Sequence, residues 1–239
     1  DVPIAPARGA DIKLPWELGR LQHLPQLAVA ARLAARDGDA DEAASYARAF
    51  RNQVLDFIAA NPPRFGVQWV SSMDVALRAV SLALALDLLR DGGVGFDEGF
   101  TDLVSASLLA HARHVRDNLE RGALGRANHY LCNVAGLAVA AAFLPDGDEA
   151  RRLRAFAAAE VEAELAHQLL PDGGHLEAST GYHRLCTDAI LFAPAVGGGG
   201  VAGQGAAMAV WALGRGGVFS LCLALAAVGS LVAGFGYQA

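Results

Sequence analysis

The strongest constraint on the fold of this chain is a series of helix-like segments separated by short breaks. Within a segment the apolar residues recur at helical spacing, as Val54, Leu55 and Ile58 do. The breaks contain residues that cannot continue a helix, such as Pro62 and Pro63, or glycines that end one. Residues 1–15 are expected to be an irregular lead-in. The predicted helices span residues 20–36, 40–60, 71–90, 98–120, 128–143, 147–170 and 180–192.

The amino-acid composition also favours helices. Alanine and leucine supply most of the apolar residues, whereas aromatic residues make up only 7% of the chain. Because these two residues are good helix formers and no alternating strand pattern stands out, an all-α fold is predicted. Broad apolar stripes indicate helices packed on two sides, and short connections indicate antiparallel hairpins. We expect an (α/α) toroid of such hairpins, although the periodicity alone would equally permit a helical bundle.

The sequence changes character after residue 192. Residues 193–239 are rich in glycine and carry one charge, at Arg215. We therefore predict one domain at residues 1–192, followed by a Gly/Ala-rich apolar tail at 193–239. Three interpretations of the tail remain open: a membrane segment at residues 216–235, a buried helix pair, or a sequence foreign to the fold, such as one read in a shifted frame.

Charge and cysteine usage argue against several protein classes. The net charge is −6, with 19 basic against 25 acidic residues, so no basic surplus points to nucleic acid. Three widely spaced cysteines without a CxxC pair indicate buried thiols rather than disulfides or a zinc site. No Walker-type loop and no GxGxxG that enters a helix is present, and no metal or cofactor is predicted. His111 and His114 have a spacing seen in metal ligands, but the arginines interleaved with them favour a solvated helix face.

Two polar clusters stand at predicted helix starts. The first covers residues 61–78 and places Gln68 and Trp69 just before a helix that a serine can cap. It can equally be a packed loop with a capping serine. The second is Asn128-His129-Tyr130, in which Asn128 is either a helix N-cap or a cleft residue. Adjacent helical residues diverge by about 100°, so two of these three side chains can face a cleft while the third packs.

A third polar cluster covers residues 171–184. A glycine-rich turn at residues 171–174 leads through Glu177 to a Ser/Thr cap and then to Tyr182, His183 and Arg184. As structure, this is a turn, a cap and the start of an amphipathic helix. As chemistry, it offers a phenol beside cationic groups, which favour the ionised form of a phenol.

Four stretches of the sequence resemble successive motifs of the heparinase II/III family of polysaccharide lyases and of related alginate lyases. They appear in the order of the family and cover roughly residues 11–192. The resemblance implies an α/α-toroid domain that is followed in the family by a β-sandwich domain, and nothing in residues 193–239 resembles that second domain. The stretches are residues 16–25, residues 61–78, Asn128-His129-Tyr130-Leu131 and Glu177 to Arg184.

The resemblance also implies a reaction, β-elimination in an acidic polysaccharide that contains uronic acid. Hydrogen-bond donors on the uronate carboxylate stabilise the charge that develops when the C5 proton leaves. Asn128, helped by His129, matches the family residue for this role, and Tyr182 matches the tyrosine that protonates the leaving oxygen and can also act as the base in syn eliminations. The residues expected to bind substrate are Gln68, Trp69, Arg78, Glu177, His183 and Arg184.

Several alternatives remain open at the level of function. The substrate can be heparan sulfate, alginate or a bacterial exopolysaccharide, because all three carry uronates. The chain can instead be a glycan-binding remnant that does not cleave, or a non-enzymatic helical protein tethered to a membrane. By family analogy we expect a periplasmic or secreted protein, although the chain shows no signal-like segment at its start.

Overall fold

The computed structural model describes residues 9–122 and 126–196 and confirms the all-α prediction for them. Within these residues there is no strand, and Leu169 and His175 form an isolated β-bridge. The elements are α1 (Lys13–Gly19), α2 (His23–Arg36), α3 (Ala40–Ala60), the short 3-10 helix η1 (Val67–Trp69), α4 (Ser72–Asp91), α5 (Glu98–Asp117), α6 (Asn128–Ala142), α7 (Asp148–Gln168) and α8 (Thr180–Val196).

The helix boundaries follow local capping chemistry. Asp39, Ser71 and Asp97 precede α3, α4 and α5, and each side chain accepts a hydrogen bond from a backbone N–H of the first turn. Gly38 and Gly93 follow the ends of α2 and α4 with positive φ, a conformation that costs glycine little. These boundaries lie within a few residues of the predicted ones.

Two further differences from the prediction lie near the ends of the described chain. Helix α1 begins inside the lead-in at residues 1–15 that was expected to be irregular. It can contain Pro15 because this is its third residue, and a first-turn amide needs no partner within the helix. Helix α8 extends to Val196, beyond the predicted end at residue 192. The remainder of the predicted tail, including the proposed membrane segment at residues 216–235, lies outside the described residues.

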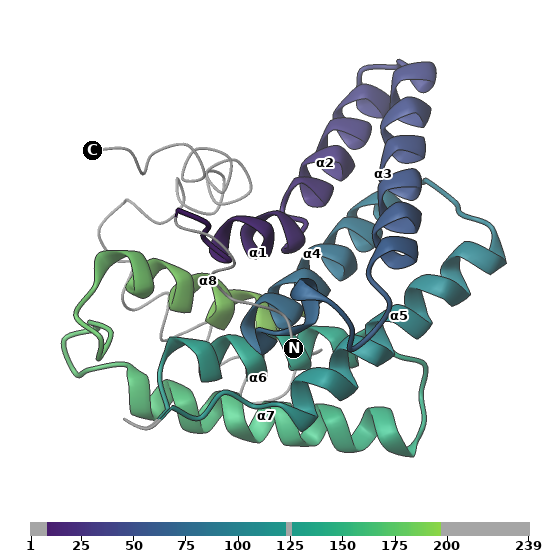
Figure 1. Cartoon of the computed structure of the whole chain (residues 1–239). Coiled ribbons are helices and arrows are strands. Elements are labelled where there is room, and N and C mark those ends of the chain that lie inside the picture. Colours follow the sequence, from purple (N-terminus) through teal and green to yellow (C-terminus); the bar gives the residue numbers. More distant parts are fainter. Residues whose placement is uncertain (1–8, 123–125, 197–239) are drawn as a thin grey trace.

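The helices form an arc of hairpins with an inner and an outer row. Helices α2, α4, α6 and α8 pack on one another in chain order and form the inner row. Helices α3, α5 and α7 each pack on the inner helix before them and form the outer row. In Figure 1 the α2–α3 hairpin projects at one end of this arrangement. This is the toroid-like architecture expected from the sequence.

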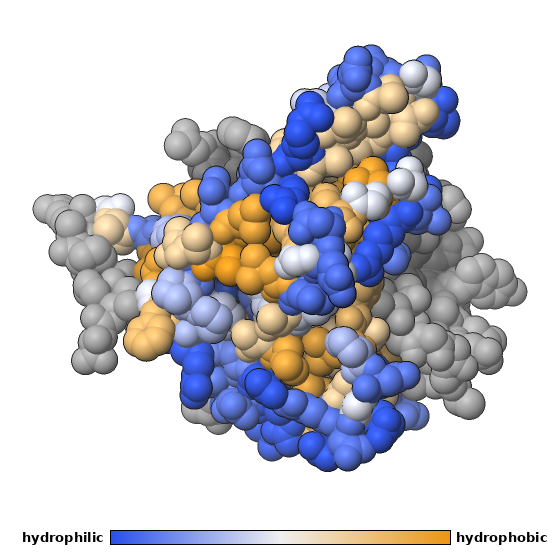
Figure 2. Space-filling view, turned by 90° about the vertical axis from the view of Figure 1, so that its right-hand side faces the viewer, coloured by the Kyte–Doolittle hydropathy of each residue, from blue (hydrophilic) through white to orange (hydrophobic). Residues whose placement is uncertain are grey.

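The core lies along the inner row. Helices α4 and α6 are buried around most of their surface, and they cross where Gly136 faces Ala76. On the face shown in Figure 2, apolar residues gather in central patches and hydrophilic residues surround them. Cys132 and Cys186 are free, buried thiols, as predicted, and burial raises the pKa of both, to about 12 for Cys186. The third cysteine, Cys222, lies outside the described residues. Among the helices described, none is both long and apolar enough to cross a membrane.

Candidate active site at the starts of the inner helices

The starts of the inner helices lie along one side of the arc. Arg20, which precedes α2, donates through Nε to the buried Asp74 carboxylate in the first turn of α4, over 2.5 Å. The backbone N–H of Met73 in α4 donates to Glu120, which lies in the segment before α6. The first residue of α6 then bonds to the segment before α8 through Glu177. Polar residues that are far apart in sequence are thereby brought together.

Asn128 is buried at the start of α6 and is held by Glu177. Its backbone N–H donates to Oε1 of Glu177 over 2.7 Å, and its Nδ2 lies 2.8 and 2.9 Å from the two carboxylate oxygens. Asn128 is therefore not the N-cap of α6, since its side chain bonds no backbone group of the helix. The Glu177 carboxylate supplies the capping acceptor instead.

A chain of hydrogen bonds fixes the loop that carries Glu177. The backbone N–H of Glu177 donates to Nδ1 of the buried His175, so Nε2 of this imidazole carries the proton and donates to Oε1 of Gln168. Nε2 of Gln168 donates to the buried Glu164 and to the carbonyl of Ala127, directly before Asn128. Burial lowers the pKa of His175, which keeps the ring neutral and preserves this pattern.

His129 is half exposed beside Asn128 and pairs with Glu120. Its Nδ1 lies 3.3 Å from Oε1 of Glu120. The other oxygen of Glu120 accepts from the backbone N–H of Met73 and from Nδ2 of Asn133, so the carboxylate is fixed on one side and faces the imidazole on the other. The hydrogen bond to Glu120 raises the pKa of His129 and outweighs the opposing effect of burial.

Tyr182 is exposed in the first turn of α8, with 45% of its surface accessible. The hydroxyl of Ser179 accepts from the backbone N–H of Tyr182, so the predicted Ser/Thr cap is present. His183 is partly buried in the same turn, and Arg184 is exposed with its Nε 3.9 Å from Asp188. The start of α8 therefore presents an accessible phenol next to the loop in which Glu177 holds Asn128.

The structure places Trp69 and Arg78 in the core and not at a sugar-binding surface, which corrects the sequence prediction. The Arg78 guanidinium is fully buried between the rings of Phe57 and Trp69. It donates to the carbonyls of Gly19 and Gln68 and to the His111 imidazole. Stacking and carbonyl bonds satisfy this cation inside the protein, and Trp69 is only 5% exposed.

Gln68 belongs to the same hydrogen-bonded cluster as Arg78. Its Nε2 donates to the carbonyl of Pro15, and its side chain packs so closely on Gly19 that a Cβ there would lie 1.7 Å from Oε1. Arg78 and Gln68 together tie α1 and η1 to α4. Gln68 and Arg78 shape the wall of the fold, and their hydrogen bonds within the described residues go to partners other than Asn128.

His111 also differs from the sequence prediction, because it lies in the core and not on a solvated helix face. Its Nδ1 donates to the carbonyl of Ser107 while Nε2 accepts from Nε of Arg78. Burial, reinforced by the charge of Arg78, lowers the pKa of His111 to about 3. In the described part of the chain, no group of three or more His, Cys, Asp or Glu residues is arranged to hold a metal ion.

Sequence reasoning missed several polar residues on this side of the arc. Arg20 and Asp74 lie inside the stretches that resemble the family. They are 54 residues apart, and no local sequence pattern predicts that they pair. Glu120 was assigned to the end of a helix, whereas α5 ends at Asp117 and Glu120 turns toward His129. Tyr130 is fully buried and donates to Glu160 while accepting from Arg121, so it is the packing member of the Asn128-His129-Tyr130 triplet.

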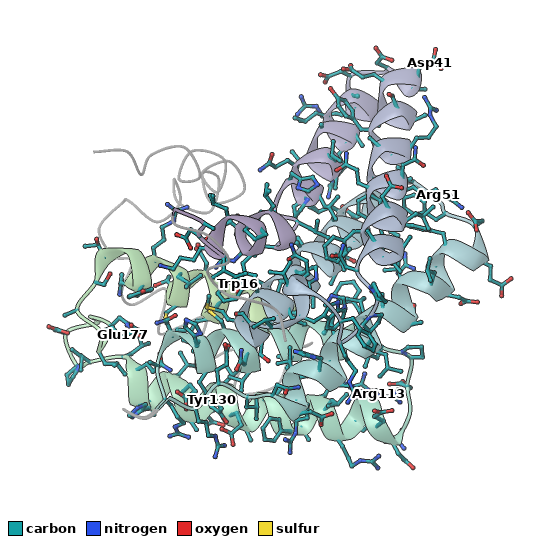
Figure 3. All side chains as sticks on the ribbon, viewed as in Figure 1. Trp16, Asp41, Arg51, Arg113, Tyr130 and Glu177 are labelled. Carbon is teal, nitrogen blue, oxygen red and sulfur yellow. The ribbon has the colours of Figure 1, made fainter. Side chains whose placement is uncertain are left out.

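A cavity of about 520 Å³ lies elsewhere, between the α2–α3 hairpin and the loop at residues 92–97. Alanine and glycine form most of its wall, and Arg51 and Asp97 pair at 2.7 Å in its lining. Arg51 and Glu177 lie at opposite sides of Figure 3. None of the predicted site residues lines this cavity. Asn128, His129 and Tyr182 lie instead at the starts of α6 and α8, and this region is the candidate active site.

The fold and this site define an α/α-toroid domain with an amide, an imidazole and a phenol at the starts of two inner helices. A family model described as heparinase II/III N-terminus matches residues 4–199, and the chain therefore belongs to this family. No curated protein sequence matches the chain.

One solved structure, described as a heparinase III, shares the fold with a TM-score of 0.60 and 21% sequence identity. The match covers 87% of this chain and 34% of that one, so the chain spans about a third of the length of that protein.

Proposed function

We propose that this chain provides the helical part of a lyase that cleaves uronic-acid-containing polysaccharide by β-elimination. The observation that carries the proposal is the meeting of Asn128 and His129, at the start of α6, with the segment that leads into Tyr182 at the start of α8. Membership of the heparinase II/III family supports it.

The starts of α6 and α8 suit an anionic sugar. Each helix N-terminus carries a partial positive charge, which favours a nearby carboxylate. His129, whose pKa is raised, adds a donor that is protonated over a wider pH range than an ordinary imidazole. Together with an amide N–H of Asn128, these groups would bind the uronate carboxylate and stabilise the negative charge that develops on it.

The elimination itself requires two proton movements. The C5–H bond and the C4–O bond break, a C4=C5 double bond forms, and the departing O4 oxygen gains a proton. Tyr182 is accessible and suits a syn elimination: as the phenolate it would take the C5 proton, and the phenol so formed would give that proton to the departing O4 oxygen. The substrate class is any polymer with a uronate on the non-leaving side of the bond, which includes heparan sulfate, alginate and uronate-containing exopolysaccharides.

The test is to incubate the full chain with heparan sulfate, alginate and a uronate-containing exopolysaccharide, and to follow the ultraviolet absorbance of the unsaturated product. Tyr182→Phe should reduce the rate by roughly 100-fold or more, because it removes the general acid. Tyr46→Phe is the matched control, since that phenol lies on α3, away from the site, and its hydroxyl donates to Glu42. If none of these polymers yields product, or if Tyr182→Phe retains the full rate, the proposal is wrong. Saturable binding without product would make the chain a glycan-binding domain.

A further inference from the structure

The amide of Asn128 can act on a substrate only if its orientation is fixed. Glu177 contacts Nδ2 with both carboxylate oxygens, at 2.8 and 2.9 Å. The two oxygens of one carboxylate lie in nearly the same direction from this nitrogen, whereas the two N–H bonds of an amide diverge widely. One N–H is therefore shared between both oxygens, and the second points away from Glu177.

The same contact prevents the amide from turning over. A reversed amide would place Oδ1 against the carboxylate, and two acceptors repel each other at this distance. In the observed orientation Oδ1 is buried without a hydrogen-bond partner among the described residues. An unsatisfied buried carbonyl costs about 1–3 kcal/mol, so the charged contact to Glu177 must outweigh that cost to hold the orientation.

The backbone on both sides of Glu177 is constrained. The N–H of Glu177 donates to His175. Ala178, the next residue, has a φ of 50°, in the left-handed region that alanine rarely adopts. Residues held in such conformations are over-determined by their surroundings and cluster at functional sites. The strained residue follows the one carboxylate that contacts Asn128 in the described structure.

We propose that Glu177 is a positioning residue, which sets the Asn128 amide so that its second N–H is free for the substrate carboxylate. The proposal rests on the proposed lyase function and changes the role expected for Glu177, since a residue that holds Asn128 need not touch sugar. The negative charge of Glu177 then has two effects. It repels an anionic substrate, which weakens binding and raises KM, and it fixes the Asn128 amide, which stabilises the transition state and raises kcat.

The kinetic test is Glu177→Gln, which keeps one oxygen to cap α6 but removes the charge and lets the Asn128 amide reverse. The expected result is a fall in kcat of about tenfold or more, with KM unchanged or lower. Glu162→Gln, on the exposed face of α7, makes the same change of charge and should alter neither constant. If Glu177→Gln keeps the wild-type kcat while the wild type is active, the positioning proposal is wrong and the lyase proposal stands.

A second measurement does not depend on activity. In the 15N-labelled full chain, the two side-chain amide protons of Asn128 should differ widely in chemical shift, because only one of them bonds to a carboxylate. Glu177→Gln should bring the two shifts closer together, whereas Glu162→Gln should leave them apart. Equal spectra for Glu177→Gln and wild type would overturn the positioning proposal. If the wild type forms no unsaturated product, the lyase proposal fails, and this measurement still decides whether Glu177 orients Asn128.

Discussion

Among single residues, His129 shows most directly how a neighbour tunes the chemistry of this site. Glu120 reaches the imidazole with one oxygen because its other oxygen is fixed by Met73 and Asn133. Burial opposes the ionised form of Glu120, but the bonds from His129 and Asn133 outweigh it, and the pKa of Glu120 is lowered. The pair therefore favours a charged imidazole facing a charged carboxylate.

Glu120→Gln should lower the pKa of His129, because the hydrogen bond and the charge of Glu120 are the main causes of its upward shift. The measurement is an NMR titration of the imidazole C–H resonances, in which the midpoint for His129 moves to lower pH. A midpoint that stays in place would show that Glu120 does not control this imidazole.

At this scale the sequence predicted the site only in part. Asn128, Glu177 and Tyr182 stand in motifs whose residue types are unusual beside plain Ala/Leu helices, and the structure brings their segments together. Trp69 and Arg78 carry the same kind of signal but are core residues. An aromatic ring beside a cation stacks equally well in a protein interior and on a sugar, so residue type alone could not separate the two.

At the scale of elements, the hairpin units were predictable because their ends are encoded locally. Caps and breaks such as Asp39, Ser71 and Pro62 act within one turn of chain, so both ends of α3 and the start of α4 follow from sequence. Contacts between elements are different. Glu177 caps α6 because two segments 49 residues apart pack together, and no local sequence pattern predicts this contact.

The crossing of α4 and α6 yields a prediction about stability. A Cβ at Gly136 would lie 2.7 Å from Cβ and 2.8 Å from the carbonyl oxygen of Ala76, and a backbone atom cannot move aside cheaply. Gly136→Ala gains about 1 kcal/mol of helix propensity but should lose more to overpacking, whose usual cost is about 1–3 kcal/mol. We expect a net loss of unfolding free energy in urea denaturation.

Gly181→Ala in α8 is the matched control, because a Cβ there meets only the Ser179 hydroxyl, at 3.8 Å. That substitution should be neutral or stabilising, since nothing opposes the gain in helix propensity. If Gly136→Ala proved as stable as Gly181→Ala, the inner helices would not cross as closely as the structure indicates.

For the whole molecule, the arc explains why the site lies on one side. Each outer helix returns the chain to the same side, so all inner helices begin there, and the polar segments before α2, α4, α6 and α8 meet. Arg78 and His111 form a polar anchor inside the core, because their buried hydrogen bonds join α1, η1, α4 and α5.

This anchor makes the stability of the fold depend on pH. The pKa of His111 is lowered to about 3 in the folded chain, whereas an unfolded histidine titrates near about 6.5. Above pH 6.5 neither state binds the proton, and the stability supplied by the neutral ring is complete. As the pH falls from about 6.5 toward 3 the unfolded state gains a proton that the folded state refuses, and unfolding becomes easier by up to about 1.4 kcal/mol per pH unit.

Comparison with His111→Gln isolates this effect from the other titrating groups. His129 acts with the opposite sign, because its raised pKa favours the folded state as the pH falls, and His114 acts with the same sign as His111. Both contributions are common to wild type and variant, so the difference between their urea unfolding free energies reports His111. That difference should be largest at pH 7 and shrink toward pH 4.5, because only the wild type loses the stability of a neutral His111. A difference that stayed constant over this range would show that His111 is protonated without penalty and does not anchor the core as a neutral ring.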